Sequence, residues 1–292
     1  MSQIPTEKAV EELHGIPAGQ WPSPVKAKVM RAVWRSMGRV PGIGGVLLTR
    51  SLRHWQQGRA MIPAALVLSV LDEQLLIRVN PADLTHRLAA VSWGQDGIKS
   101  HDFRESFVAE GDLSGYLSPL KQDRLTAEID QLFACHFRWR ETASWVMLAQ
   151  RLRERGRFVH NNVRIASLSD LDAYFQRYAE LAESIQTHGY RLRRELTSGA
   201  AASSGFARSW RIERGEEEVG VAIGPKGEIW RYRGGYHRTA IARNLGLETM
   251  PVQVKLVHGD WLRREMAGKG LNLPFTTSIR NIMKCKKHPK FG

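Results

Sequence analysis

The chain has 292 residues, of which 42% are hydrophobic and 25% charged. These proportions are typical of a globular protein that buries a sizeable core, as one large domain or two small ones. Its longest apolar run, residues 60–71, has twelve residues, whereas a membrane-spanning helix needs about 20. The composition therefore excludes a membrane span, and we predict that residues 60–71 form a buried core segment.

Only two cysteines occur, Cys135 and Cys285. They exclude a disulfide framework and a four-thiolate zinc site, and they favour a reducing, cytoplasmic setting. The first residues carry three glutamates and no apolar stretch of the kind that a secretory signal needs, so we expect no such signal.

The net charge of +14 is concentrated at the two ends of the chain. Residues 1–60 contribute +6 and residues 263–292 contribute +7, which leaves +1 for the rest. Basic ends are typical of contact with nucleic acid, acidic lipid or a polyanionic substrate, so nucleic acid is a candidate partner through the termini. A solvated tail that aids solubility is the alternative.

The first predicted helix lies between Pro24 and Gly38, with Pro24 in its first turn and Gly38 just past its end. Apolar residues recur in it at helical spacing: Val25, Val29, Val33 and Met37. Because Lys and Arg lie beside them, this stripe would suit a helix at a membrane surface. Packing on the core explains the same pattern and is the interpretation we favour. No strand signal precedes residues 42–45, so we predict a flexible turn there instead of a nucleotide-binding loop.

Residues 61–168 are predicted to be mostly helical, with one strand at 74–79 and helical spacing from about 125 to 155. Ser169 is the predicted N-cap of the next helix, which ends at Gly189. The apolar stripe of this helix runs from Leu171 to Ile185. Residues 198–205 are predicted to form a loop, with a mobile lid as the alternative.

The sequence then predicts a β-hairpin, in which residues 219–223 and 228–232 are joined by a tight turn. A helix follows to about Leu245, and residues 251–257 alternate as a half-buried strand does. Together these elements indicate an α+β fold with an α-rich N-terminal region and a small mixed sheet with flanking helices. We divide the chain into a basic segment at 1–60, a helical region at 61–168, a domain at 169–262 and a basic tail at 263–292.

Six residues between the hairpin and the helix form the strongest candidate site, here named the glycine box: Gly234, Gly235, Tyr236, His237, Arg238 and Thr239. Glycine lets the backbone approach a ligand closely. The first amides of the following helix lack intrahelical partners and lie at the positive end of the helix dipole, so they favour an anion. Arg238 could add a bidentate contact, and we therefore predict a phosphate or nucleotide site.

Three successive pieces of sequence around this box resemble the N-terminal domain of ParB-type partition proteins and the related sulfiredoxins. They are the helix end at 180–189, the strand–turn–strand that runs into residues 235–238, and the helix, glycine and proline-led strand at 242–254. Their order and spacing agree over residues 179–258, about a quarter of the chain. The resemblance implies a ParB/sulfiredoxin-like fold for residues 169–262 and a bound nucleotide, namely ATP, ADP or CTP with Mg²⁺.

The chain also departs from these families. About thirty residues follow Trp261, too few for the DNA-reading and dimerisation regions of a partition protein, so we expect neither. Tyr236 stands where sulfiredoxins have their catalytic cysteine, which excludes thiolate chemistry at that position. Relatives that phosphorylate free serine have an aspartate and a histidine on either side of the second glycine, where this chain has Gly234 and Tyr236.

Three classes of function follow from these observations, and the last of them is a glycan- or lipid-pathway protein that acts on an anionic carrier, with the helix at residues 24–38 on a membrane surface. In the first, the protein is a nucleotide-dependent phosphotransferase or hydrolase, with His237 and Glu183 as candidate catalytic residues. Mg²⁺ would need one or two carboxylates, and five are candidates without a ranking: Glu183, Glu213, Glu216, Glu218 and Glu228. In the second, it is a non-catalytic nucleotide-gated or nucleic-acid-binding module. A structural role for His237 and Arg238, in which they pair with a neighbouring carboxylate, is the remaining alternative.

Overall fold

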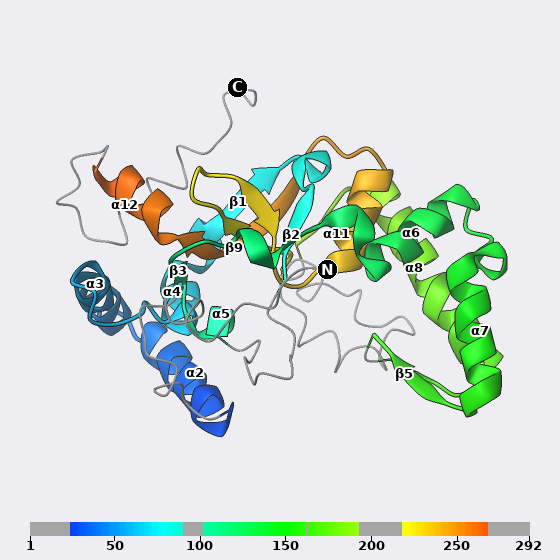
Figure 1. The fold of residues 1–292 in the computed structure, drawn as a ribbon, viewed down its shortest axis with the longest axis horizontal. Coiled ribbons are helices and arrows are strands. Elements are labelled where there is room, and N and C mark those ends of the chain that lie inside the picture. Colours follow the sequence, from blue (N-terminus) through cyan, green and yellow to red (C-terminus); the bar gives the residue numbers. More distant parts are fainter. Residues whose placement is uncertain (1–23, 90–101, 162, 193–217, 268–292) are drawn as a thin grey trace.

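The computed structural model describes residues 24–89, 102–161, 163–192 and 218–267. Its centre is a seven-stranded mixed sheet, with helices α2–α4 at one end of the molecule and α6–α8 at the other (Figure 1). The fold is therefore α+β with a mixed sheet and flanking helices, as the sequence predicts. No helix among the described residues is long and apolar enough to cross a membrane.

The helices have the following bounds: α2 Pro24–Gly38, α3 Ile43–Gln56, α4 Ala64–Leu71, α5 Asp102–Glu105, α6 Arg124–Ala134, α7 Ala143–Arg155, α8 Leu168–His188, α11 Tyr236–Asn244 and α12 Gly259–Ala267. The strands are β1 Leu76–Val79, β2 His86–Leu88, β3 Val108–Ala109, β4 Leu117–Pro119, β5 Phe158–His160, β6 Val163–Ile165, β7 Gly220–Ile223, β8 Ile229–Arg231 and β9 Met250–His258. Strands β5 and β6 form a separate two-stranded sheet.

The strands of the main sheet follow the order β1, β9, β7, β8, β2, β4, and β3 also pairs with β9. The pairs β7–β9, β8–β2 and β3–β9 are parallel, and the others are antiparallel. One sheet thus combines strands from residues 76–119 with strands from 220–258. The boundary that we expected at residue 168 therefore does not separate the sheet from the preceding region.

Strand β9 carries a β-bulge in the middle of the sheet. Val221 pairs with Val254, but the next residue, Ala222, pairs with Leu256. The extra residue, Lys255, is buried. Val257, three residues after Val254, packs in the same hydrophobic cluster as Val254. The simple alternation expected for residues 251–257 is therefore interrupted at one position.

Three hydrophobic clusters hold these layers together. The first packs α3, α4 and α12 on the sheet, the second lies among α6, α7 and α8, and the third includes Trp230 and Leu256. Helix α11 contributes Ala242 to the first cluster and Ala240 and Ile241 to the second. It therefore joins the two helical ends of the molecule, and the glycine box at its start lies between them.

Several elements match the sequence predictions closely. Helix α2 begins at Pro24 and includes Gly38, one residue more than predicted, α8 ends at Gly189, and the hairpin β7–β8 is followed by α11 and β9. Residues 64–71 of the apolar run form α4, most of which is buried. The strand predicted at 74–79 begins two residues later, because residues 72–75 form a 3₁₀ turn.

Other predictions were wrong in instructive ways. Residues 42–45 are not a flexible turn, because α3 begins at Ile43 and Gly44 packs against the backbone of Gly38. Helix α8 is capped by Ser167 instead of Ser169, since the Ser167 hydroxyl accepts a hydrogen bond from the amide of Asp170. The region 61–168, expected to be mostly helical, contains helices together with six strands among the described residues, and four of these strands, β1–β4, belong to the central sheet.

The side of α2 that we expected to pack on the core faces outward. Val29, Val33 and Met37 are exposed, whereas Ala27 is buried and Trp34 packs against the first cluster. The core contact is made by a different side of the helix, which carries Ala27 and Trp34. A Cβ on Gly38 would lie 2.7 Å from the Cβ of Ser69 on α4. Residues 198–205, Glu213, Glu216 and Cys285 lie outside the described residues.

Substituting Gly235 is expected to destabilise the protein more than substituting Gly246. Both residues have a left-handed backbone, with φ near +65°. A Cβ on Gly235 would clash with Cγ2 of Val219, whereas a Cβ on Gly246 would meet open space. Gly235→Ala should therefore lower the free energy of unfolding in urea by about 1–3 kcal/mol more than Gly246→Ala does. Equal losses would contradict the close packing of Gly235.

Candidate functional site

The glycine box turns the chain from strand β8 into helix α11. Gly234 and Gly235 have φ values of 68° and 65°, and Gly235 is the N-cap of the helix. Because Gly235 lies against Val219, just before β7, the first turn of α11 is pressed onto the end of the hairpin. Helix geometry leaves the amides of Tyr236 and His237 without an intrahelical acceptor at this point.

Two further contacts hold α11 in place. The Thr239 hydroxyl and the Thr239 amide both donate to the carbonyl oxygen of Gly235, each at 2.9 Å. At the other end of the helix, Arg243 and Asn244 donate to the carboxylate of Asp130 on α6 at 2.9 and 2.7 Å. The predicted site residue Thr239 therefore uses its hydroxyl to close the first turn, and the helix is fixed at both ends.

Arg238 is buried and lies close to a carboxylate. Its Nη1 atom is 3.5 Å from Oε2 of Glu218, and its exposed fraction is 8%. Sequence reasoning considered both a phosphate contact and this kind of pairing for Arg238. In the structure the Arg238 guanidinium faces Glu218, and this charge pair borders the start of α11.

A second arginine, Arg231 at the end of β8, is fully buried under the box. The carbon at the centre of its guanidinium lies 3.0 Å from the centre of the Tyr236 ring, the first residue of α11. Among the described residues, Nη2 donates a hydrogen bond to the carbonyl oxygen of Tyr232 at 3.1 Å, and the Tyr236 side chain also interacts with the guanidinium. The Nε and Nη1 atoms are buried without a hydrogen-bond partner among the described residues. Burial lowers the pKa of Arg231 to about 10, which leaves it charged at neutral pH.

Arg231 shares this buried region with an acidic and a basic side chain. Asp123, the N-cap of α6, is 5% exposed, and its Oδ1 lies 3.4 Å from Nη1 of Arg87 on β2. Its second oxygen, Oδ2, is buried and has no hydrogen-bond partner among the described residues. The charge of Asp123 favours the protonated form of Arg231, and that of Arg87 opposes it. One carboxylate therefore pairs with Arg87 and lies close enough to Arg231 to influence its charge.

His237 is held as a neutral imidazole. Its ring stacks on Tyr178 of α8 at 4.1 Å between centroids and 27° between planes, and its Nε2 is buried without a partner among the described residues. Burial, with the nearby charge of Arg177, lowers the pKa of His237 to about 3. A base this weak is a poor proton acceptor at neutral pH, so the arrangement suits hydrogen bonding better than general base catalysis.

A buried polar network lies behind His237. The Tyr178 ring meets the Tyr174 ring edge-on, and the Tyr174 hydroxyl donates to Glu128 on α6 at 2.9 Å. Nε2 of His160 lies 2.9 Å from the other oxygen of Glu128. Because this buried carboxylate is paired on both oxygens, we interpret the network as structural support for the site.

The carboxylates proposed from sequence do not gather at the box. Glu183 is exposed, and it lies five residues after Tyr178, about 140° around α8 and roughly 7.5 Å along its axis. It therefore points away from the side of α8 that contacts His237. Glu218 pairs with Arg238, and the exposed Glu228 accepts from the amide of Lys226. Among the described residues no group of three or more His, Cys, Asp or Glu side chains could hold a metal ion.

Sequence reasoning missed Arg231, Arg87 and Asp123 as components of the site. Arg231 was noted only as part of a strand, and the other two lie more than 100 residues earlier. The signal that could have found Arg231 is a charged residue in an apolar, short strand directly before the glycine box. Its neighbours depend on the parallel pairing of β8 with β2, which places Arg87 opposite Arg231.

The chain matches no protein-family model, and comparisons with curated proteins and with solved structures found no significant match. The likeness to ParB-type and sulfiredoxin domains therefore stays a prediction from sequence.

The depressed pKa of His237 predicts a specific dependence of stability on pH. The unfolded chain takes up a proton near pH 6.5, whereas folded His237 stays neutral until about pH 3. Stability should therefore fall as the pH drops through this window, by up to about 1.4 kcal/mol per pH unit from this residue. Urea unfolding of His237→Gln should show a shallower decline than the wild type over this range. Parallel curves would contradict the burial of a neutral imidazole.

Proposed function

We propose that the start of α11 and the buried Arg231 bind a phosphate group of a nucleotide or another phosphorylated small molecule. The observation that carries this proposal is the Arg231 guanidinium, which is fully buried beside the first residue of α11 with two nitrogen atoms lacking partners among the described residues. A charged group in this state is costly unless an anion or carboxylate satisfies it.

A phosphate group fits the chemistry of this region. Its oxygens accept several hydrogen bonds at once, and the guanidinium offers two N–H donors in a planar fork. The amides of Tyr236 and His237 add neutral donors at the positive end of the helix dipole. Arg87 and Arg231 together exceed the charge of Asp123, so the buried charges favour an incoming anion.

The resemblance to ParB-type and sulfiredoxin domains narrows the ligand to ATP, ADP or CTP with Mg²⁺. It is supported by the order of elements from α8 to β9, in which a helix ending in glycine precedes the hairpin, the box helix and the final strand. Catalysis is a weaker inference than binding, since His237 is a poor base and Glu183 faces away from it. A non-catalytic nucleotide-gated module therefore fits the same site.

Calorimetry tests binding directly. Titrations of the full chain with inorganic phosphate, ADP, ATP and CTP, each with and without Mg²⁺, should release or absorb heat for at least one of them. Turnover of the bound nucleotide, followed by release of inorganic phosphate, then separates an enzyme from a binding module. Absence of heat with all four would contradict the proposal.

Replacing Arg231 should raise the stability of the ligand-free protein and weaken its binding of phosphate. Arg231→Met removes a buried charge with unsatisfied donors, so the free energy of unfolding without ligand should rise by about 1–3 kcal/mol. Loss of two charge-assisted hydrogen bonds should weaken phosphate binding roughly 100-fold. The exposed Arg155→Met on α7 serves as the control and should change neither quantity. An Arg231→Met protein that binds as tightly as the wild type would contradict the assignment.

Glu218 is expected to oppose anion binding. Its carboxylate lies 3.5 Å from Arg238 and places a negative charge at the start of α11. Glu218→Gln should therefore raise the affinity for phosphate, whereas Arg238→Gln should lower it. Calorimetry of the two variants, with circular dichroism to verify folding, measures both changes. Weaker binding by Glu218→Gln would show that the carboxylate supports the site instead of competing with the ligand.

A further inference from the structure

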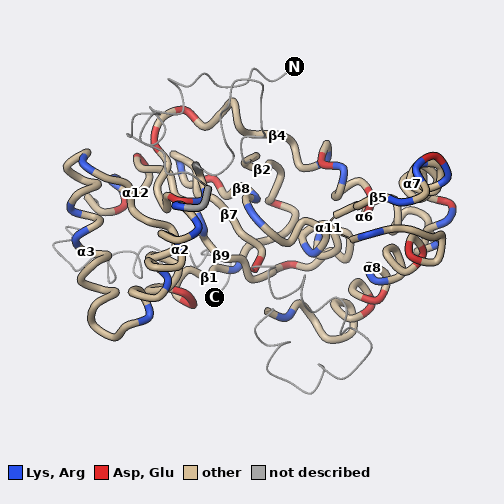
Figure 2. Tube along the Cα trace, turned by 90° about the horizontal axis from the view of Figure 1, so that it is seen from below, with Lys and Arg blue, Asp and Glu red and all other residues tan. Residues whose placement is uncertain are grey.

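Helices α2 and α3 carry an unusual concentration of exposed apolar side chains. The described residues include eleven large hydrophobic side chains that are exposed, and seven of them lie between residues 29 and 46: Val29, Met30, Val33, Met37, Val40, Ile43 and Val46. We name this surface the α2–α3 face. Both views place these helices at the end of the molecule opposite α7 (Figures 1 and 2).

The apolar residues of α2 form one continuous stripe. Successive helical residues turn by 100°, so Val29, Met30, Val33 and Met37 fall within an arc of about 100°. The inward side of the helix is occupied by Ala27 and Trp34. The stripe is therefore separate from the contact with the core, and the next apolar residues along the chain, Val40 and Ile43 at the start of α3, are exposed as well.

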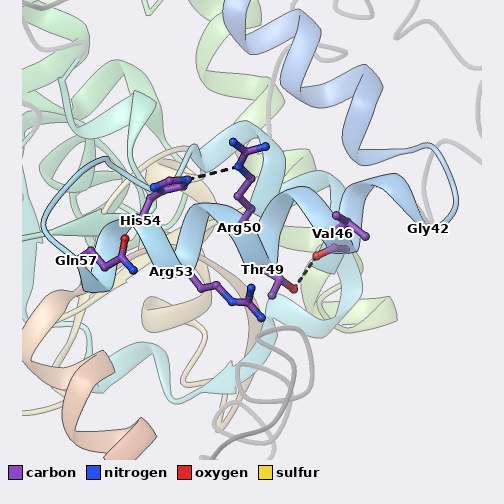
Figure 3. A pocket seen from close by; sticks show the side chains of 8 residues that line it. Gly42, Val46, Thr49, Arg50, Arg53, His54 and Gln57 are labelled. Carbon is purple, nitrogen blue, oxygen red and sulfur yellow. Dashed lines mark hydrogen bonds between the residues drawn. The ribbon is translucent and has the colours of Figure 1, made fainter.

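On α3, apolar and basic side chains share one side of the helix. Ile43, Val46, Arg50 and Arg53 fall within an arc of about 80°, while Leu48, Leu52 and Trp55 face the core. Figure 3 shows Val46, Arg50, Arg53 and His54 along this outward side. They line the same shallow pocket, together with Gly42, Gly45, Thr49 and Gln57.

The charged residues of helices α2 and α3 and their flanking residues are all basic. Residues 24–60 contain eight Lys and Arg and no Asp or Glu. Of these, Arg31 is used internally, since it pairs with Glu105 on α5. Lys28, Arg35, Arg50 and Arg53 are exposed, and Figure 2 marks the basic positions along both helices. The face therefore combines a positive field with apolar side chains that reach into solvent.

We propose that the α2–α3 face docks on an anionic lipid membrane surface. Interfacial helices place apolar side chains at the boundary of the acyl chains and Lys or Arg near the negatively charged headgroups. Nucleic acid would use the basic residues but would leave exposed Val, Ile and Met side chains in contact with water or phosphate. The association is peripheral, and it is independent of the phosphate site at the glycine box.

Co-sedimentation of the full chain with vesicles tests this inference. The wild type should sediment with vesicles that contain phosphatidylglycerol and remain in the supernatant with phosphatidylcholine alone. A basic side chain near an anionic surface contributes about 1 kcal/mol, which corresponds to roughly a five-fold change in partitioning. The double variant Arg50→Gln, Arg53→Gln should therefore bind about 25-fold more weakly. Val46→Asp should weaken binding as well, because it places a carboxylate in the apolar part of the face.

The chain offers matched controls at its opposite end. Val159, 65% exposed, corresponds to Val46, 68% exposed, and Arg153 and Arg155 on α7 correspond to Arg50 and Arg53. Val159→Asp and the double variant Arg153→Gln, Arg155→Gln should sediment like the wild type. No sedimentation of the wild type would overturn the proposal. An equal loss of sedimentation in both sets of variants would also overturn it. So would α3 variants that bind duplex DNA more weakly but still sediment with vesicles like the wild type.

Discussion

The contact between Gly235 and Val219 determines how the centre of this protein is arranged. Gly235 has a left-handed backbone and lies so close to Val219 that no larger residue fits there. This contact fixes the first turn of α11 against the start of the hairpin β7–β8. Because α11 contributes to two of the three hydrophobic clusters, its position also sets how the two helical ends of the molecule meet.

That position places the ring of Tyr236 over the guanidinium of Arg231 and removes the arginine from water. The Tyr236 ring and the charge of Asp123 offset part of the burial, but one nitrogen donates to a carbonyl and two lack hydrogen-bond partners among the described residues. The cost of a buried charge is therefore concentrated at the start of a helix whose dipole also favours an anion. A bound phosphate would satisfy both the buried charge and the positive end of the helix dipole. When Arg231 is replaced, we therefore expect phosphate binding to weaken and the stability of the ligand-free protein to rise.

Local patterns predicted the hairpin, α11 and α8 because turn residues, caps and apolar periodicity lie within each segment. The site was less predictable, since the pairing of β8 with β2 brings Arg87 to Arg231 from a distant part of the chain. The stripe of α2 was assigned to the core because periodicity shows that a helix is amphipathic without showing which partner covers it. The bulge at Lys255 likewise depends on strand pairing.

An anion bound at Arg231 would satisfy the buried guanidinium, and a crystal soaked with tungstate tests this position directly. Tungstate resembles phosphate in shape and charge and scatters X-rays anomalously. We predict an anomalous peak within hydrogen-bond distance of Nε or Nη1 of Arg231, next to the amides of Tyr236 and His237. A structure in which tungstate binds only elsewhere, while Arg231 is satisfied by a protein group, would contradict the central claim.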